Sequence, residues 1–245
     1  MIKEYNYTNQ IIPSILEKDI LVVENKIKEY SCLTNNLHID ICDGLYVKNV
    51  TWLPDKDAVY DVFANNNLNL EFDMMVTSEN LEKYLTIIIT FSMEKIILHY
   101  DAFENKKDIK RHILFIKDKL SSAEVGIAFK SDQFLNIDHI YNDENIKEAI
   151  KYCDYIQIMG ISIIGIQGQP LDTRSILSAN VLNSYLTKIC LKKMIQIDGG
   201  INLETIKLFK FVYNLYFGVN NFVVGSFIKN NSDKKLTFDL LSKVF

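Results

Sequence analysis

The chain has 245 residues, of which 48% are hydrophobic and 24% charged, and its formal net charge is −4. These values are ordinary for a globular protein and exclude the disordered and fibrous classes. The slight acidity gives no reason to expect nucleic acid as a partner. Only Arg111 and Arg174 are arginines, so we do not expect a bidentate arginine clamp to hold any bound anion.

The cysteine pattern and the apolar stretches bear on the compartment. No two cysteines form a CxxC pair, and their separations fit no zinc module. Residues 1–10 are polar and lack the apolar core of a signal peptide, and the most apolar helical stretch, 85–93, is too short to cross a bilayer. We therefore expect a reduced, cytoplasmic protein with no membrane partner.

Short apolar runs alternate with amphipathic stretches along the whole chain. The expected strands are, in order, 11–16, 37–41, 68–75, 95–99, 124–129, 155–159, 194–198 and 221–224. The expected helices are 17–30, 78–91, 106–120, 172–192, 203–211 and 233–244, with Asn202 and Ser232 as N-caps of the last two. No linker interrupts the pattern, which predicts a single domain over residues 1–245.

Strands that alternate with helices predict parallel βαβ units. Eight such units in a chain of this length are typical of a (β/α)8 TIM barrel in the α/β class. A doubly wound open sheet is the main alternative. That fold usually has a Gly-rich turn after its first strand, and the residues here are Ser14-Ile15-Leu16-Glu17.

The expected strands read as apolar up to their C-terminal ends, where polar residues and glycines gather. These are Ser14, His38, Asp40, Asp73, His99, Asp198, Gly225 and Ser226. In a barrel the C-terminal ends of all strands meet at one mouth, where active sites are found. Any one of them could simply be a hydrogen-bonded buried residue, but their recurrence on so many strands predicts a site at this mouth.

His38 and Asp40 are two residues apart, so in a strand their side chains point to the same face. Imidazole and carboxylate ligands suit Zn, Fe(II), Mn or Co, and Asp73 and Asp198 could complete a set of four ligands. A buried His–Asp pair without a metal is the alternative for these two residues.

Most glycines fall on three loops that follow the sixth, seventh and eighth expected strands. Gly199 and Gly200 end the seventh strand, Gly225 ends the eighth, and residues 160–169 follow the sixth. Glycine lets backbone N–H groups approach a ligand closely, so these loops predict a phosphate site that needs no arginine. We interpret Gly126 and Gly218 as turn glycines.

The segments that carry these residues resemble the family of ribulose-phosphate 3-epimerase and allulose-6-phosphate 3-epimerase. The likeness runs from Ile12 to Ile228. Its most specific part is Leu37-His38-Ile39-Asp40-Ile41-Cys42-Asp43-Gly44, and Ile197-Asp198-Gly199-Gly200 and Val224-Gly225-Ser226 follow in the family's order. The resemblance implies a metal-dependent barrel enzyme that inverts the carbon next to a ketone in a phosphorylated ketose, here D-ribulose 5-phosphate to D-xylulose 5-phosphate.

The resemblance also implies roles for individual residues. His38, Asp40 and Asp198 would bind one divalent metal ion, and Asp40 and Asp198 would be the acid/base pair on the two faces of the substrate. Ser14 would contact the substrate, and Met75 and Met159 would wall the reacting carbon. The phosphate would be held by Gly168, Gly199, Gly200, Gly225 and Ser226.

Departures from the family leave alternatives open. The fourth ligand in the family is a histidine where this chain has Asp73, which either favours Mn(II) or Fe(II) or marks the loss of the metal. The loop after the sixth strand also differs. An allulose-6-phosphate 3-epimerase and a sugar-phosphate-binding relative without turnover therefore remain alternatives. The related decarboxylase and aldolase group is disfavoured, because residues 71–76 lack its Asp-x-Lys-x-x-Asp motif.

The remaining histidines and charged residues near strand ends carry weaker expectations. His99 would contact either the substrate or a metal ligand. His112 and His139 are expected to face solvent, and Lys130 and Asp132 to lie in a solvated loop. Family members are commonly oligomeric, so the resemblance leaves a homo-oligomer open.

Overall fold

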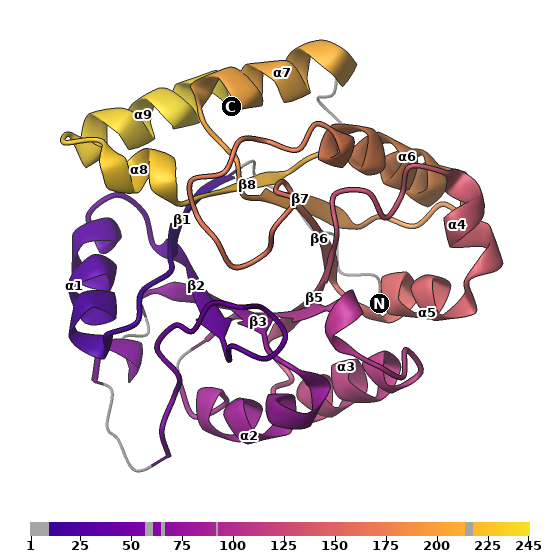
Figure 1. The fold of residues 1–245 in the computed structure, drawn as a ribbon, viewed down its shortest axis with the longest axis horizontal. Coiled ribbons are helices and arrows are strands. Elements are labelled where there is room, and N and C mark those ends of the chain that lie inside the picture. The colour runs from indigo at the N-terminus through magenta and orange to yellow at the C-terminus, as the bar shows by residue number, and fades with distance from the viewer. Residues whose placement is uncertain (1–9, 57–60, 65–66, 92, 214–217) are drawn as a thin grey trace.

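The computed structural model describes residues 10–56, 61–64, 67–91, 93–213 and 218–245, in which eight parallel strands close into a barrel in chain order (Figure 1). The helices form a ring around it. The structure thus confirms the (β/α)8 barrel and excludes the open doubly wound sheet. Residues 1–9, to which most of the expectation about a signal peptide refers, lie outside the described residues.

The strands are short and follow one another around the barrel. They are β1 (Gln10–Ile15), β2 (Asn36–Cys42), β3 (Asn69–Met75), β4 (Lys95–His99), β5 (Glu124–Phe129), β6 (Tyr155–Met159), β7 (Met194–Asp198) and β8 (Asn221–Val224). The last five coincide with the expected ranges, whereas β1 and β2 differ by one residue at both ends and β3 by one residue at its start.

Helices connect the strands. They are α1 (Ile20–Ser31), α2 (Ser78–Ile88), α3 (Asp108–Lys119), α4 (Ile137–Asn142), α5 (Glu144–Tyr152), α6 (Arg174–Lys188), α7 (Leu203–Tyr213), α8 (Ser226–Asn230) and α9 (Lys234–Val244). Two 3₁₀ turns, η1 (Asp61–Ala64) and η2 (Tyr100–Ala102), lie between them. The sequence analysis did not identify α4, α5 or α8.

Helix ends follow the capping chemistry, with one correction. The side chain of Asn202 accepts hydrogen bonds from the N–H groups of Glu204 and Thr205, as expected for an N-cap. The expected cap at Ser232 is wrong by one residue, because Asp233 caps α9 by accepting from Leu236. The expected helix 172–192 begins later, at Arg174. Asp172 lies before the helix, and its Oδ1 accepts a hydrogen bond from the N–H of Arg174.

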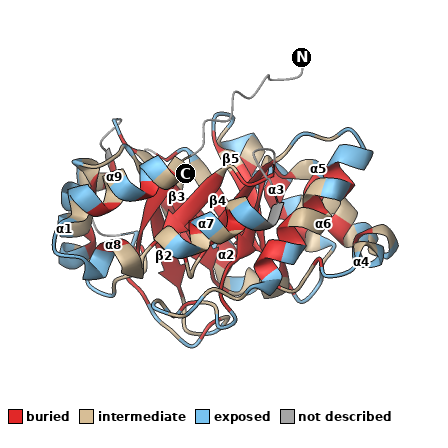
Figure 2. Cartoon of the chain, turned by 90° about the horizontal axis from the view of Figure 1, so that it is seen from above, coloured by how far each residue is buried: buried red, intermediate tan, exposed pale blue. Residues whose placement is uncertain are grey.

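Side chains along the strands alternate between the helices outside and the barrel interior. On β2, Leu37, Ile39 and Ile41 belong to the main apolar core, and His38 and Asp40 point the other way. The strands are buried in the centre, and the helices expose their outer faces (Figure 2). The main apolar core therefore lies between barrel and helices, and the interior holds polar residues together with a smaller apolar cluster that includes Ile97 and Met194.

The expectation that the strands are apolar up to their C-terminal ends is wrong in the barrel interior. Glu71, Gln157 and Gln196 lie in the middle of β3, β6 and β7 and are buried. In the sequence, each of them is a single polar residue within an apolar run. In a barrel they share one interior layer, where they satisfy one another by hydrogen bonds.

The strand register brings the C-terminal polar residues to one level. Asp40 is paired with Asp73 across β2 and β3, and Met159 with Asp198 across β6 and β7. One layer below, Ser14 and Glu71 flank His38 on either side. No described helix combines the length and the apolarity needed to cross a membrane.

Candidate active site

A compact group of acidic and imidazole side chains lies at the C-terminal mouth of the barrel. His38 and Asp40 come from β2, Asp73 from β3 and Asp198 from β7, and all four are buried. One potential ligand atom from each lies within 4.8 Å of every other. The structure therefore brings together the four residues that the sequence analysis grouped as metal ligands.

His38 is oriented by a carboxylate behind it. Its Nδ1 lies 2.5 Å from Glu71 Oε1, and since a carboxylate only accepts, Nδ1 carries the proton of the neutral ring. Its Nε2 is buried, has no hydrogen-bond partner among the described residues, and lies 3.4 Å from Asp40 Oδ1 and 3.5 Å from Asp73 Oδ2. A buried imidazole nitrogen without a partner, facing carboxylates, is the donor arrangement that a divalent cation requires.

The electrostatics of the group favour a cation. Burial lowers the pKa of His38, but Asp40, Asp73 and Glu71 outweigh it and raise this pKa well above its usual value. The surrounding carboxylates thus hold positive charge at His38, as a proton in the metal-free chain. A metal ion would compete with this proton for Nε2.

Asp73 is held by two donors, one on each oxygen. His99 Nε2 lies 2.8 Å from its Oδ1, and Gln157 Nε2 donates to its Oδ2 at 3.0 Å. Burial would raise the pKa of Asp73, but His99 and His38 lower it below the usual range. Asp73 is therefore ionised and held in place on both oxygens. Of the two expectations for His99, the structure supports the contact with a metal ligand.

Asp40 and Asp198 have the opposite electrostatic character. Burial raises the pKa of Asp198 well above its usual value, and Asp40 and Asp73 raise it further against the effect of His38. Burial also raises the pKa of Asp40, again opposed by His38. Close, buried carboxylates cannot all stay ionised without a cation, so these two are the groups that take up a proton most readily.

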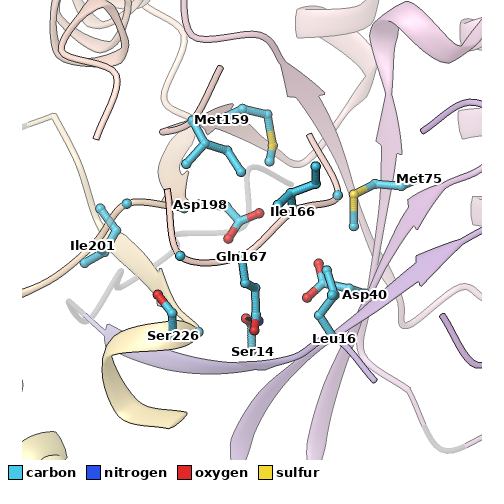
Figure 3. A pocket seen from close by; sticks show the side chains of 16 residues that line it. Ser14, Leu16, Asp40, Met75, Met159, Ile166, Gln167, Asp198, Ile201 and Ser226 are labelled. Carbon is cyan, nitrogen blue, oxygen red and sulfur yellow. Dashed lines mark hydrogen bonds between the residues drawn. The ribbon is translucent and has the colours of Figure 1, made fainter. Parts of the chain in front are cut away.

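A pocket opens above this cluster (Figure 3). Both Asp40 and Asp198 line it, the first from β2 and the second from β7. All but one of the expected substrate residues line it as well: Ser14, Met75, Met159, Gly168, Gly199, Gly200, Gly225 and Ser226. The exception is His99, which contacts Asp73. The space between its lining atoms is about 460 Å³, part of which is open solvent.

Two glycines of the pocket are required by their backbone conformation. Gly199 and Gly200 have φ values of +96° and +70°, which L side chains rarely adopt. A Cβ on Gly200 would also lie 2.6 Å from the backbone of Leu171. The loop after β7 therefore depends on glycine at both positions, and both line the pocket.

The loop after β6 covers one side of the pocket and contributes a residue that the sequence analysis missed. Gln167 lines the pocket, and its Nε2 donates to Ser14 Oγ at 3.2 Å. A second hydrogen bond, from Asn49 Nδ2 to the Gly165 carbonyl at 2.9 Å, ties the same loop to the segment after β2. The sequence did contain a signal for Gln167, because it lies between Gly165 and Gly168. Glycines at this spacing indicate a loop that approaches the pocket closely.

Gly126 is a correction, because it lies in β5 and not in a turn. A Cβ there would lie 2.5 Å from the ring of Tyr155, whose hydroxyl donates to Glu71 Oε2 at 2.9 Å. The glycine makes room for this ring inside the barrel. Gly126 therefore supports the carboxylate that orients His38.

His112 is a second correction, because it is buried and not solvent-facing. Its Nδ1 lies 2.9 Å from the Asp108 carbonyl, and its ring packs edge-on against Phe103. His139 is exposed, as expected. Lys130 pairs with Asp101 outside the pocket.

Comparison with known proteins identifies relatives along nearly the whole chain. A model of the ribulose-phosphate 3 epimerase family matches residues 10–229. The chain is 28% identical over 172 residues to ribulose-phosphate 3-epimerase of Aquifex aeolicus, covering 69% of this chain and 68% of that protein. It is 26% identical over 239 residues to ribulose-phosphate 3-epimerase of Helicobacter pylori, covering 96% and 97%.

Solved structures with a similar fold are more distant in sequence. KGPDC from Streptococcus mutans has a TM-score of 0.62 at 10% identity, over 98% of this chain and 97% of that one. A 3-hexulose-6-phosphate synthase has a TM-score of 0.61 at 12% identity, over 96% and 99%. At these identities the likeness shows the barrel fold alone.

Proposed function

Since the chain belongs to the ribulose-phosphate 3-epimerase family, we propose that it is a metal-dependent epimerase that interconverts D-ribulose 5-phosphate and D-xylulose 5-phosphate. The observation that carries the proposal is that two carboxylates from different strands, Asp40 of β2 and Asp198 of β7, line one pocket and belong to a cluster of metal-ligand type. Inversion of a carbon needs one group to remove its proton and a second to return a proton on the other face.

His38, Asp40, Asp73 and Asp198 would hold the metal ion. Their fit rests on the buried, unpartnered Nε2 of His38 and on the closeness of the three carboxylates. When bound, a divalent ion supplies positive charge that stabilises an enediolate. Zn, Fe(II), Mn and Co all accept such ligands, and three carboxylates with one imidazole favour Mn(II) or Fe(II).

Proton transfer falls to Asp40 and Asp198. For a given epimer, the carboxylate on the side of the C3 hydrogen removes this proton, which leaves a planar enediolate. The other aspartate, in its protonated form, then donates from the opposite face. Both carboxyl groups line the pocket, and a positioned carboxyl group can act as base or as acid according to its protonation state.

The rest of the pocket would bind and orient the sugar phosphate. Met75 and Met159 place apolar walls beside the two carboxylates and exclude water from the reacting carbon. Ser14 and Gln167 offer polar groups to the sugar hydroxyls. The phosphate would lie against the main chain of Gly168, Gly199, Gly200, Gly225 and Ser226, where loops after the last strands of such barrels commonly hold it.

The preference for a pentulose over a hexulose phosphate is part of the proposal. D-Allulose 6-phosphate is the alternative substrate, because the loop with Gln167 departs from the family's pattern. A relative that binds sugar phosphate without turnover is the second alternative. It is disfavoured by Asp73, which is ionised and held by two donors in the position of the family's fourth ligand. We further propose one domain over residues 1–245 and a cytoplasmic location.

Proton exchange tests the proposal directly. The purified chain is loaded in turn with Mn(II), Fe(II), Co(II) or Zn(II) and incubated with each ketose phosphate in heavy water. We expect deuterium at C3 and formation of the 3-epimer, both detected by NMR, with the pentulose phosphate turned over faster. Absence of exchange with either substrate under every metal would overturn the proposal, and binding without exchange would support the non-catalytic alternative.

A further inference from the structure

Below the cluster of possible metal ligands, the barrel interior holds a layer of buried polar side chains that the proposed reaction does not use. Glu71 is 2% exposed, and Gln157 and Gln196 are fully buried. Burying such groups is costly unless every one is hydrogen-bonded. Their hydrogen bonds form one connected path from His38 to Asp73.

The path has a fixed direction, which follows from donor and acceptor chemistry. A carboxylate only accepts, so Gln196 must present its NH₂ group to Glu71, and Nε2 lies 2.7 Å from Glu71 Oε1. The same Nε2 donates to Gln157 Oε1 at 2.8 Å. With its oxygen used as an acceptor, Gln157 must point its own NH₂ group at Asp73 Oδ2, 3.0 Å away.

Glu71 therefore orients both ends of the cluster above it. Directly, it accepts from His38 Nδ1 and leaves Nε2 facing the carboxylates. Through Gln196 and Gln157, it determines that the NH₂ group of the Gln157 amide, and not its oxygen, faces Asp73. Tyr155 donates to the second oxygen of Glu71 at 2.9 Å, so Glu71 is surrounded by donors on both oxygens.

We propose that Gln157 is a positioning residue that fixes the Asp73 carboxylate as a metal ligand, with its amide orientation set by Gln196 and Glu71. Asp73 forms a hydrogen bond with His99 through Oδ1 and accepts one from Gln157 through Oδ2. With His99 alone, the carboxylate can turn about its last bond and lose its alignment with His38 Nε2, which lies 3.5 Å from Oδ2. This inference rests on the metal site of the proposed function.

Metal binding measured without substrate tests the inference. The variant Gln157→Met keeps the length of the side chain and removes the donor to Asp73. We expect Co(II) affinity, measured by competition with a chelating dye, to fall about 10- to 100-fold, the usual cost of losing a partner behind a metal ligand. The visible absorption spectrum of bound Co(II) should change as well, because the geometry at Asp73 changes.

A double-mutant cycle separates positioning from a general structural effect. If Gln157 acts through Asp73, adding Gln157→Met to Asp73→Ala should cost no further Co(II) affinity. Gln196→Met leaves Gln157 in place but removes the donor that orients it, and it should also weaken Co(II) binding. This variant tests the same path if Gln157→Met does not fold.

Ser178→Ala is the matched control. It removes a buried side chain that bonds to the Ser131 carbonyl and the Phe134 N–H, away from the cluster. It should lower resistance to urea without changing Co(II) affinity or spectrum.

Equal Co(II) affinity and spectrum in wild type and Gln157→Met, or no Co(II) binding by wild type, would overturn the inference. Weaker Co(II) binding by Gln157→Met, together with no C3 exchange by wild type, would support the inference and overturn the proposed function alone.

Discussion

Asp40 and Asp73 lie opposite each other on the paired strands β2 and β3, and His38 Nε2 lies 3.4 Å from an oxygen of the first and 3.5 Å from an oxygen of the second. The two carboxylates are not equivalent. His99 and Gln157 donate to Asp73, and His99 and His38 lower its pKa, whereas burial raises the pKa of Asp40. The register thus places a carboxylate held by two donors beside one whose pKa is raised.

Replacing either member of the acid/base pair should separate exchange from inversion. In Asp40→Asn and Asp198→Asn, one face of the substrate loses its base. We expect epimerisation at saturating metal to fall by about 10² to 10⁴, the usual contribution of a positioned acid or base. The remaining aspartate can still remove and return a proton on its own face.

Each single variant should therefore exchange the C3 proton of one epimer only, and the two variants should prefer opposite epimers. NMR of D-ribulose 5-phosphate and D-xylulose 5-phosphate in heavy water measures both exchange rates. Asp132→Asn, a change on a carboxylate that pairs with Arg174 outside the pocket, is the control and should keep both activities. Equal loss of exchange from both epimers in each variant would contradict two-base chemistry.

Metal binding should stabilise the folded chain. A ligand that binds only the native state adds about 2.7 kcal/mol when its concentration is 100 times its Kd. We expect Mn(II) or Co(II) to raise the melting temperature, and a chelator to reverse the effect. His38→Gln should abolish most of this shift, because it removes the one imidazole among the four candidate ligands. A shift that persists in this variant would place the metal elsewhere.

Gln167 should act on substrate binding more than on turnover. Its side chain reaches from the loop after β6 to Ser14, beside Gly225. Removing a hydrogen bond to a polar or charged ligand group costs about 1 to 2 kcal/mol. Gln167→Ala should therefore raise KM about tenfold with a smaller change in kcat.

The same truncation at Gln133, which does not line the pocket, serves as the control. Steady-state kinetics with both ketose phosphates measures KM and kcat for each variant. A kcat that falls while KM stays constant would show that Gln167 acts only during the chemical step. A larger change for one ketose phosphate than for the other would identify Gln167 as a determinant of substrate choice.

The parts of the molecule that are local in sequence could be predicted. Alternating strands and helices gave the barrel, since periodicity and capping act over a few residues. His38 and Asp40 could be grouped because positions i and i+2 share a strand face, and the rule that strand ends meet at one mouth added Asp73 and Asp198. The structure brings these four together.

The layer beneath them could not be predicted, because it depends on which way each strand faces and on the register of strands far apart in sequence. Gln157 and Gln196 are 39 residues apart and meet only when the barrel closes. Gly126 has a role only through the ring of Tyr155 on the next strand. Single polar residues within apolar runs were the one available signal, and they become informative once a closed barrel is expected.

Asp43 should give the fold a measurable dependence on pH. One of its oxygens accepts from the N–H groups of Leu45 and Tyr46, and the other accepts from Thr77 and Asn80 at the start of α2. Burial would raise the pKa of Asp43, but these donors outweigh it and lower the pKa. Asp43 thus ties the loop after β2, which carries Asn49, to the beginning of α2.

The sign of the effect follows from this lowered pKa. Stability from Asp43 is fully present above the pKa of an unfolded aspartate, about 3.9, and is lost as the pH falls through the lower pKa of the folded state. Asp43→Asn should lower the free energy of unfolding by about 1 to 2 kcal/mol near neutral pH, a modest value because Asp43 is only partly buried. Urea unfolding should show this difference shrinking below about pH 4 as wild type becomes protonated.

Asp118→Asn, at an exposed carboxylate, should show no difference at either pH. A gap between wild type and Asp43→Asn that stays constant across this range would mean that Asp43 stabilises the fold through its shape and not through its charge.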